Sequence, residues 1–158
     1  MTHNLMRRSK CNWIEYKQSA EQTISTNSVI TWNTKKSTGN DSVSIDGSGI
    51  ISLSSLKRYW LQASVCVQRS TYNTDFQFDF QESDGTSLDQ SEGNFGCKFV
   101  WDGQLSSSPY ATFPVTNSSL LASLIVNYPS TTYKLVCTNV SANSTFCAES
   151  NLFIMEME

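Results

Sequence analysis

The last nine residues of the chain read SNLFIMEME and predict a β-strand that is apolar on both faces. Neighbouring side chains of a strand point to opposite faces. Leu152 and Ile154 therefore face one way, while Phe153, Met155 and Met157 face the other. Both faces of such a strand have to be shielded from water by other parts of the protein or by a partner. We expect one face to pack on the core of its own domain and the other on another subunit.

Most of the remaining chain consists of short runs in which apolar and polar residues alternate, with clusters of turn-forming residues between them. Residues 120–128 also fit one face of a short helix, although their β-branched neighbours favour a strand. Residues 12–24 are ambiguous between a turn of helix and coil. The runs predict strands, before the final one, at residues 29–32, 43–45, 50–53, 58–68, 75–80, 95–101, 111–115, 120–128 and 132–140.

This pattern predicts an all-β domain. About nine or ten short strands without a firm helix are typical of a two-sheet antiparallel sandwich. We assign the sandwich to residues 27–158 and interpret residues 1–26 as an N-terminal anchoring or extended segment. The expected core is the set of inward-facing residues on the strongest strands, namely Tyr59, Leu61, Val65, Phe76, Phe78, Phe80, Leu152 and Ile154.

Composition and charge narrow the classes of function. Lys plus Arg is 11 and Asp plus Glu is 14, so the net charge of −3 gives no electrostatic reason to expect nucleic acid as a partner. Only 16% of residues are charged, and 26 Ser and 15 Thr provide much of the polar surface, as in many virion or extracellular β-proteins. Residues 1–25 lack the apolar run of a signal peptide, and no 18 consecutive residues are apolar. We therefore expect neither export nor membrane insertion.

The five cysteines, Cys11, Cys66, Cys97, Cys137 and Cys147, include no CxxC pair. Cys97 and Cys137 share strand parity with large apolar residues, as small buried side chains do. An odd number without paired spacing favours reduced thiols, with one disulfide as the alternative.

Residues suited to catalysis are few, and we predict that the protein is not an enzyme. The single histidine, His3, lies near the N-terminus, so a Ser-His-Asp triad has no credible base. Asp75 and Asp79 share one strand face, and a glycosidase could use such a pair. Alternating carboxylates on a strand more commonly form solvated surface.

Metal or cofactor binding is not expected. A zinc site built on several histidines is excluded, and the cysteines lack paired spacing. The loop that carries Glu82, Asp84 and Asp89 is the one calcium candidate, and a plain polar hairpin tip is the simpler interpretation.

The order of several motifs resembles that of a known superfamily. Residues 28–33 (SVITWN) open the domain, residues 49–53 (GIISL) follow, and residues 59–65 (YWLQASV) come next. With the final strand, this order resembles the C1q/tumour-necrosis-factor-like jelly roll, in particular the compact versions in viral and phage fibre or capsid-decoration proteins. Two features depart from the animal C1q pattern: Lys57-Arg58 replaces the usual glycine before the core tyrosine, and no collagen-like stalk is present.

The resemblance implies a trimer in which the last strand lies in the inner sheet near a three-fold axis. One face of that sheet would build the core, and the other would build the trimer interface. For Trp32 and Trp60, packing under loops within one subunit is the alternative. The candidate interface residues are Trp32, Trp60, Cys66, Phe153, Met155 and Met157.

We therefore expect a homotrimeric, non-enzymatic virion protein, a fibre head, spike or capsid decoration made in the host cytoplasm. Its N-terminal segment would contact other virion proteins, and its loops would bind a host surface receptor or glycan. Aromatic rings beside amide or carboxylate groups suit sugar binding. The alternative is a monomeric carbohydrate-binding or structural β-sandwich module. The candidate loop residues are Tyr72, Asn73, Asp84, Asp89 and Tyr110.

Overall fold

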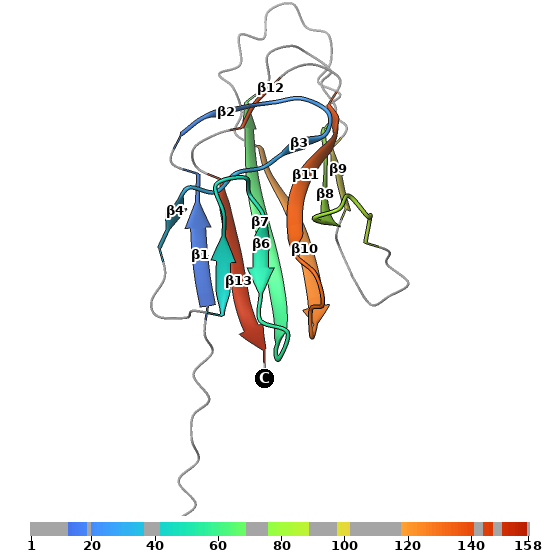
Figure 1. The fold of residues 1–158 in the computed structure, drawn as a ribbon. Helices are drawn as coiled ribbons and strands as arrows, with labels where there is room; N and C mark the ends of the chain where they lie inside the picture. Colours follow the sequence, from blue (N-terminus) through green and yellow to red (C-terminus); the bar gives the residue numbers. More distant parts are fainter. Residues whose placement is uncertain are drawn as a thin grey trace, which may run out of the picture.

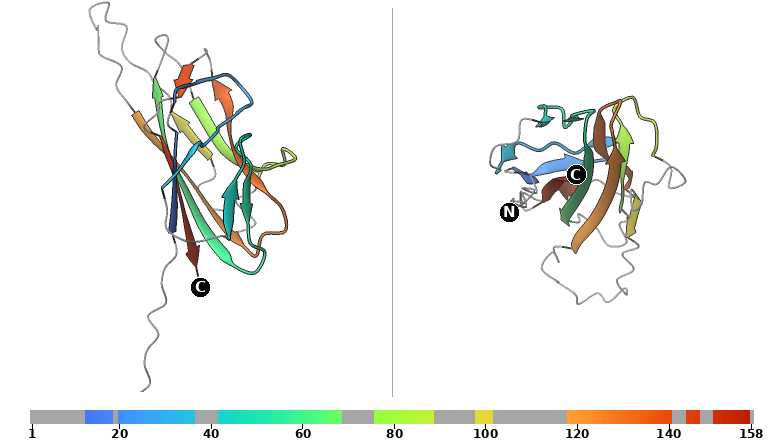
Figure 2. Two further views of the ribbon diagram at one scale, coloured as in Figure 1. Left: turned by 60° about the vertical axis from the view of Figure 1, so that its left-hand side comes forward. Right: turned by 90° about the horizontal axis from the view of Figure 1, so that it is seen from below.

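The fold consists of two antiparallel sheets packed as two layers (Figures 1 and 2). A computed structural model describes residues 13–18, 20–36, 42–68, 76–88, 98–101, 118–140, 144–146 and 150–157. These residues form strands and turns with no helix, so the expected all-β, two-sheet antiparallel architecture is confirmed. None of the described segments forms a helix with the length and hydropathy needed to cross a membrane.

The larger sheet has the order β4-β1-β13-β7-β10 across most of its width. Beyond the end of β13, β12 pairs with the same edge of β7, and β2 pairs with β12. Its strands are β1 (Trp13–Lys17), β2 (Gln22–Ile24), β4 (Thr34–Lys35), β7 (Arg58–Gln68), β10 (Ser118–Asn127), β12 (Ser144–Phe146) and β13 (Asn151–Met157). We call it the seven-stranded sheet.

The second layer, the six-stranded sheet, has the order β5-β6-β11-β8-β9. β3 pairs with β11 as well, through Val29 opposite Val136 and Ser28 opposite Cys137. Its strands are β3 (Ser28–Val29), β5 (Val43–Ile45), β6 (Ile51–Leu53), β8 (Phe76–Glu82), β9 (Lys98–Trp101) and β11 (Tyr133–Val140).

The long-range strand pairs are nested along the chain. β1 pairs with β13, β6 with β11, β7 with β10, and β8 with β9. Successive pairs of this nest lie in alternate sheets, because β1, β13, β7 and β10 belong to the seven-stranded sheet and the others to the six-stranded sheet. These four pairs of the described strands are therefore nested in the chain and alternate between the two layers.

Side chains from both sheets fill the space between the layers. Tyr59, Phe78 and Phe80 are the largest side chains that are fully buried, and Tyr16 and Tyr133 add to the same core. Burial raises the pKa of both Tyr16 and Tyr133 because it disfavours the phenolate. Of the residues expected in the core, those buried here are Tyr59, Leu61, Val65, Phe78, Phe80, Leu152 and Ile154. The side chain of Phe76 lies outside the described part of the chain.

The N-terminal boundary differs from the sequence expectation. Within the segment that was ambiguous between helix and coil, Trp13–Lys17 and Gln22–Ile24 form β1 and β2 of the seven-stranded sheet. β1 pairs with β13 over five residues, and its Ile14 and Tyr16 are buried. Residues 13–18 and 20–24 are thus part of the sandwich rather than of a separate anchoring segment, and residues 1–12 and 19 lie outside the described residues.

The other expected strands agree with the structure to different extents. The run 58–68 coincides with β7, and residues 120–128, which also fitted a helix, form most of β10. Of the run 29–32 only Val29 is in a strand, and of the run 95–101 only Lys98–Trp101 is described. The run 111–115 lies outside the described residues. Two short strands, β4 and β12, were not expected.

Trp32 is buried within the protomer, which corrects its assignment to the trimer interface. After β3 the chain leaves the six-stranded sheet and crosses to the seven-stranded one. The Ile30 N–H donates to Leu135 O at 2.9 Å in the first sheet, and the Asn33 N–H donates to Lys17 O at 3.2 Å in the second. Trp32 lies on this crossing and packs into the core between the layers, with 4% of its surface exposed.

Gly49 is required by the turn between β5 and β6. The Asp46 carboxylate accepts hydrogen bonds from the Ser48 and Ile50 N–H groups, both at 2.9 Å. This turn holds Gly49 at φ +83°, and a Cβ atom at this position would collide with the carbonyl oxygen of Ile30. Only glycine satisfies both the backbone angle and the close approach of the Ile30 crossing.

We expect Gly49→Ala to lower the free energy of unfolding by about 2–3 kcal/mol, because it adds both backbone strain and a steric collision. Gly47→Ala is the matched control, since nothing lies within 4 Å of its Cβ position. It should change stability by less than about 0.5 kcal/mol. Urea unfolding of both variants measures the difference, and equal effects would contradict the role of Gly49.

Cys137 is a reduced, buried thiol of β11, in line with the expectation that it is a small core residue. Burial raises the pKa of Cys137 from 9.0 to about 11, while hydrogen bonds with the backbone of Asn139 and Gln77 partly offset this rise. The neutral thiol is therefore the form that the folded core holds.

This pKa predicts a loss of stability at high pH. A raised folded-state pKa contributes stability that is present below about pH 9 and is lost as the pH rises to about 11. Between pH 8 and 10.5 we expect the wild type to lose roughly 2 kcal/mol more than Cys137→Ala. Urea unfolding with a reducing agent present measures both losses. Identical losses in the two proteins would contradict the buried neutral thiol.

Candidate functional site

The outer face of the seven-stranded sheet carries a continuous row of apolar side chains. Trp13 of β1 lies opposite Met155 of β13, Met155 opposite Trp60 of β7, and Trp60 opposite Ile125 of β10. These side chains point away from the core, because their neighbours along each strand are the buried ones. Phe153 and Met157 extend the row along β13 on either side. We call Trp13, Trp60, Ile125, Phe153, Met155 and Met157 the apolar band.

The inner face of the same strands forms a parallel row that is fully covered. Ile14, Ile154, Leu61 and Leu124 lie opposite one another across β1, β13, β7 and β10, and none is more than 1% exposed. The sandwich thus covers one apolar face of these strands. The band residues stay half-buried, except Trp13, which is 44% exposed.

Trp13 and Phe153 form an aromatic stack within the band. Their ring centroids lie 5.7 Å apart with an interplanar angle of 23°, which is a stacked arrangement. The register explains the contact, because Trp13 pairs with Met155 and Phe153 lies two residues along the same face of β13. The stack joins β1 to β13 on the outer face, as Ile14 and Ile154 do on the inner face.

Few charged groups border the band. Arg58 lies beside Met157, and its Nε–H donates to Asn127 Oδ1 at 2.8 Å. Glu15 forms a 3.6 Å ion pair with Lys17 at the corner where β1 meets β4. A hydrogen bond with Lys17, together with its positive charge, lowers the pKa of Lys36 at this corner. The centre of the face is therefore apolar and its borders are polar.

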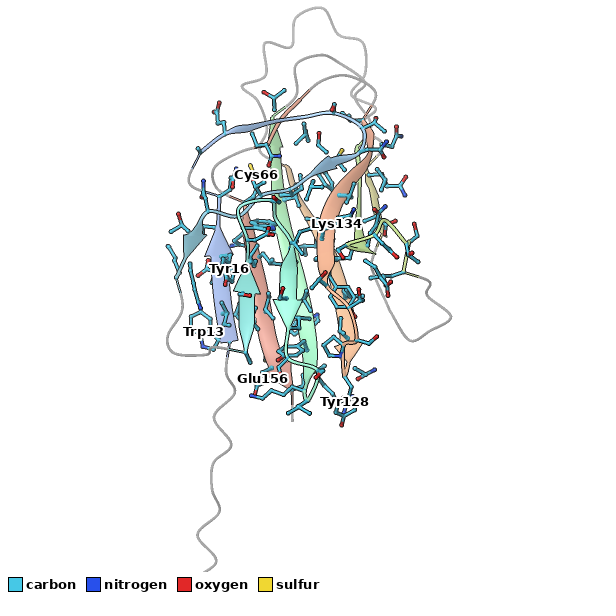
Figure 3. The ribbon with its side chains drawn as sticks, in the orientation of Figure 1. Trp13, Tyr16, Cys66, Tyr128, Lys134 and Glu156 are labelled. Atoms are coloured by element: carbon cyan, nitrogen blue, oxygen red, sulfur yellow. The ribbon has the colours of Figure 1, made fainter. Side chains whose placement is uncertain are left out.

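The end of β13 is fixed by polar contacts that reach the other layer. The Glu156 carboxylate accepts a hydrogen bond from Ser42 Oγ at 3.1 Å and pairs with Lys57 Nζ at 2.5 Å. Figure 3 shows Glu156, Trp13 and Tyr128 toward the end of the sandwich at which β13 ends, and Cys66 toward the opposite end. These contacts hold the last residues of β13, including Met157, in register beside β7.

Four of the six expected interface residues are brought together on this face: Trp60, Phe153, Met155 and Met157. Cys66, like Trp32, is not among them, because it is 5% exposed within the protomer. At Cys66 the neighbour of β7 changes from β13 to β12. Ser150 Oγ accepts a hydrogen bond from the Cys66 N–H at 2.8 Å and donates one to Cys66 O at 3.3 Å. At this position the buried Ser150 side chain therefore takes the place of a backbone partner from a neighbouring strand.

Sequence reasoning missed two band residues, Trp13 and Ile125. Residues 13–17 alternate between Ile14 and Tyr16 on one side and Trp13 and two charged residues on the other. That alternation was a usable strand signal, but the run is short and its partner is distant in the sequence. Ile125 was missed because the run 120–128 also fitted a helix. In that helix, Ile125 would share the apolar face with its neighbour Leu124 instead of lying on the opposite face from it.

Of the expected ligand and loop residues, the structure describes Glu82 and Asp84. Asp84 is exposed in the turn after β8, and a backbone hydrogen bond from Thr86 lowers the pKa of Asp84. Glu82 is half-buried. Within the described residues, no three His, Cys, Asp or Glu side chains form a metal-binding group. The remaining candidates, Tyr72, Asn73, Asp89 and Tyr110, lie outside those residues.

Asp79 also differs from its expected place on a solvated surface. It faces away from the core but is 1% exposed, and Val136, which lies opposite on β11, is also buried. Asp75, its suggested partner in a carboxylate pair, is outside the described residues. The face of β8 that carries Asp79 is therefore not the open surface that its alternation indicated.

Comparison of the chain with models of known protein families and with curated proteins gave no match.

The Trp13–Phe153 stack should stabilise the protomer by itself. A double-mutant cycle of Trp13→Ala and Phe153→Ala should give a coupling energy of about 0.5–1.5 kcal/mol, the range for stacked aromatic pairs. Urea unfolding at a protein concentration too low for self-association measures this energy. Additive effects of the two substitutions would show that the rings do not interact in solution.

Proposed function

We propose that this chain is a non-enzymatic structural or attachment protein of a virus particle, which assembles as a homotrimer through the apolar band. The observation that carries the proposal is the band itself: six half-buried or exposed apolar side chains aligned across β1, β13, β7 and β10. Aromatic and methionine side chains with few charges are typical of the centre of a protein interface. Continuous exposed apolar patches commonly mark interaction sites.

The size of the face fits one protein partner. The four strands contribute five, seven, eleven and ten residues. At about 16 Å² per residue in the plane of a sheet, they cover roughly 530 Å². The relief of the side chains adds to this area, and a standard interface buries about 800 Å² on each partner. Around a three-fold axis, neighbouring copies of the chain would cover this face, and their own bands have the apolar character and the low charge needed to do so.

The nested pairing of the strands supports a jelly roll. A jelly roll is a double-layered antiparallel ribbon built from eight principal strands. The pairs β1–β13, β6–β11, β7–β10 and β8–β9 supply eight such strands in this chain. The resemblance to the C1q/tumour-necrosis-factor-like superfamily adds the expectation that the last strand lies near a three-fold axis. The apolar outer face of β13 agrees with that position.

The role in a virus particle rests on the resemblance and on composition. Few charges and many hydroxyl side chains suit a long-lived surface. β1 begins and β13 ends at the same end of the sandwich, and β2 and β12 lie at the other (Figure 1). In the proposal, residues preceding β1 contact other virion proteins, and the end with β2 and β12 faces a host receptor or glycan.

Size-exclusion chromatography with light scattering tests the assembly. The wild type should have a mass of about 53 kDa, three times 17.7 kDa. Phe153→Asp should reduce it to the protomer mass, because a buried unpaired charge at the centre of an interface is costly. Leu56→Asp is the control, since Leu56 is 83% exposed in the β6–β7 loop, and it should stay trimeric. A monomeric wild type, or a fully trimeric Phe153→Asp, would overturn the proposal.

A monomeric carbohydrate-binding module is the second candidate. It is favoured by the exposure of Trp13 and Tyr128, since sugars stack on exposed aromatic rings. Tyr128 is 63% exposed at φ +50°, an angle that few residues other than glycine adopt. A glycan array with the wild type and with Trp13→Ala separates the candidates. A monomer whose glycan binding is lost in Trp13→Ala would support the second.

A further inference from the structure

β1 contributes to both faces of the seven-stranded sheet. Its Ile14 and Tyr16 are buried in the core, and its Trp13 supplies the most exposed ring of the apolar band. β1 is held on one side by β13 through five residue pairs. On its other side it pairs with β4 through Tyr16 and Lys17. Two further hydrogen bonds on that side run from the Lys36 N–H to Glu15 O at 2.7 Å and from the Asn33 N–H to Lys17 O at 3.2 Å, and neither reaches Trp13 or Ile14. Its N-terminal half therefore depends mainly on β13.

We infer that self-association is coupled to the docking of β1, by which we mean its pairing with β13. A protomer then has the complete apolar band only when β1 is docked. This inference rests on the proposed function and names a second copy of the chain as the occupant of the face. Without β1, the band would lose Trp13, the stacking partner of Phe153. It would also end at the backbone edge of β13, whose polar groups would enter the interface unpaired.

A second copy is the occupant that the face fits best. The charged side chains on the described outer face are Glu15, Lys17 and Arg58, with Lys36 beside Glu15 and Lys17 at the β1–β4 corner. All four lie at the borders of the band, so copies of the face meet little electrostatic repulsion at its apolar centre. A strongly charged partner would find few charges to pair with. The plan area of the four strands, with β1 included, is about two thirds of the roughly 800 Å² that each partner contributes to a standard interface, and the relief of the side chains adds to it.

The coupling is reciprocal by thermodynamic linkage. If the docked form of β1 associates more strongly than the undocked form, association must in turn favour the docked form by the same factor. β1 should therefore open less often in the assembly than in the free protomer. Strands of the six-stranded sheet, which carry no band residue, should open equally often in both.

Association measurements test the part played by Trp13. Trp13→Ala keeps Ile14 and Tyr16 and should weaken association at least about tenfold, as truncation of an interface tryptophan commonly does. Leu56→Ala, at a loop tip outside the band, should leave association unchanged. Analytical ultracentrifugation measures both. A Trp13→Ala protein that associates like the wild type would overturn the inference, because a purely structural Trp13 would change only the unfolding of the protomer.

Hydrogen exchange tests the coupling itself. Wild type is compared with Trp60→Asp, which places a charge at the centre of the band without altering a side chain of β1 or β13. Peptides that cover β1 should exchange at least tenfold more slowly in the assembly, while peptides that cover β8 should exchange alike. Equal exchange of β1 in the two forms would overturn the coupling.

The two proposals can fail separately. If Trp60→Asp is monomeric but β1 exchanges equally in both forms, assembly through the band stands and the coupling falls. If Trp60→Asp remains fully assembled, or the wild type is monomeric, the band is not the interface and both fall.

Discussion

The central position of β13 is the constraint on which the seven-stranded sheet depends. β13 pairs over five residues with β1 and over seven with β7, so both of its edges are occupied. Leu152 and Ile154 then point into the core, which leaves Phe153, Met155 and Met157 on the outer face. A shift of one residue would exchange the two sets rather than bury both. The apolar outer face is therefore a direct consequence of strand pairing.

Polar contacts at both ends of β13 fix this register. At one end, Ser150 hydrogen-bonds to the backbone of Cys66, where β7 changes neighbours. At the other end, Glu156 binds Ser42 and Lys57, which connects β13 to residues outside its own sheet. Buried polar groups that are satisfied in only one arrangement favour that arrangement over its alternatives. These contacts hold the apolar band in a defined position as well as stabilising the fold.

The sequence predicts those parts of the fold in which alternation is long and uninterrupted. β7 has eleven residues and alternates between buried and half-buried side chains from Tyr59 to Val65, and its limits were predicted correctly. β1 has five residues, and its partner β13 lies more than a hundred positions away, so the local pattern alone could not identify it. The all-β class and the two antiparallel sheets followed from the many short alternating runs. The exact pairing of the strands did not follow from these runs.

The residues of the candidate site were predictable on strands whose side chains alternate regularly between the two faces. The prediction was wrong where this alternation, or side-chain parity, is interrupted. Phe153, Met155 and Trp60 lie on regular strands, so parity placed them on one outer face. Trp32 lies on a crossing between the sheets, where no strand parity applies. Cys66 lies where a strand changes neighbours, and both Cys66 and the preceding residue are buried. Parity describes a strand with constant neighbours, and it says nothing of the segments between strands.

The place of β13 between β1 and β7 has a consequence for biosynthesis. The ribosome delivers this strand after the other described strands, yet it occupies an interior position of its sheet. A nascent chain therefore carries two unsatisfied strand edges until residues 151–157 emerge, and such edges invite pairing with other chains. Native closure must follow synthesis of these residues, and its high contact order makes it slow compared with local folding. A chaperone that shields the edges of β1 and β7 during translation would act on the stage most open to aggregation.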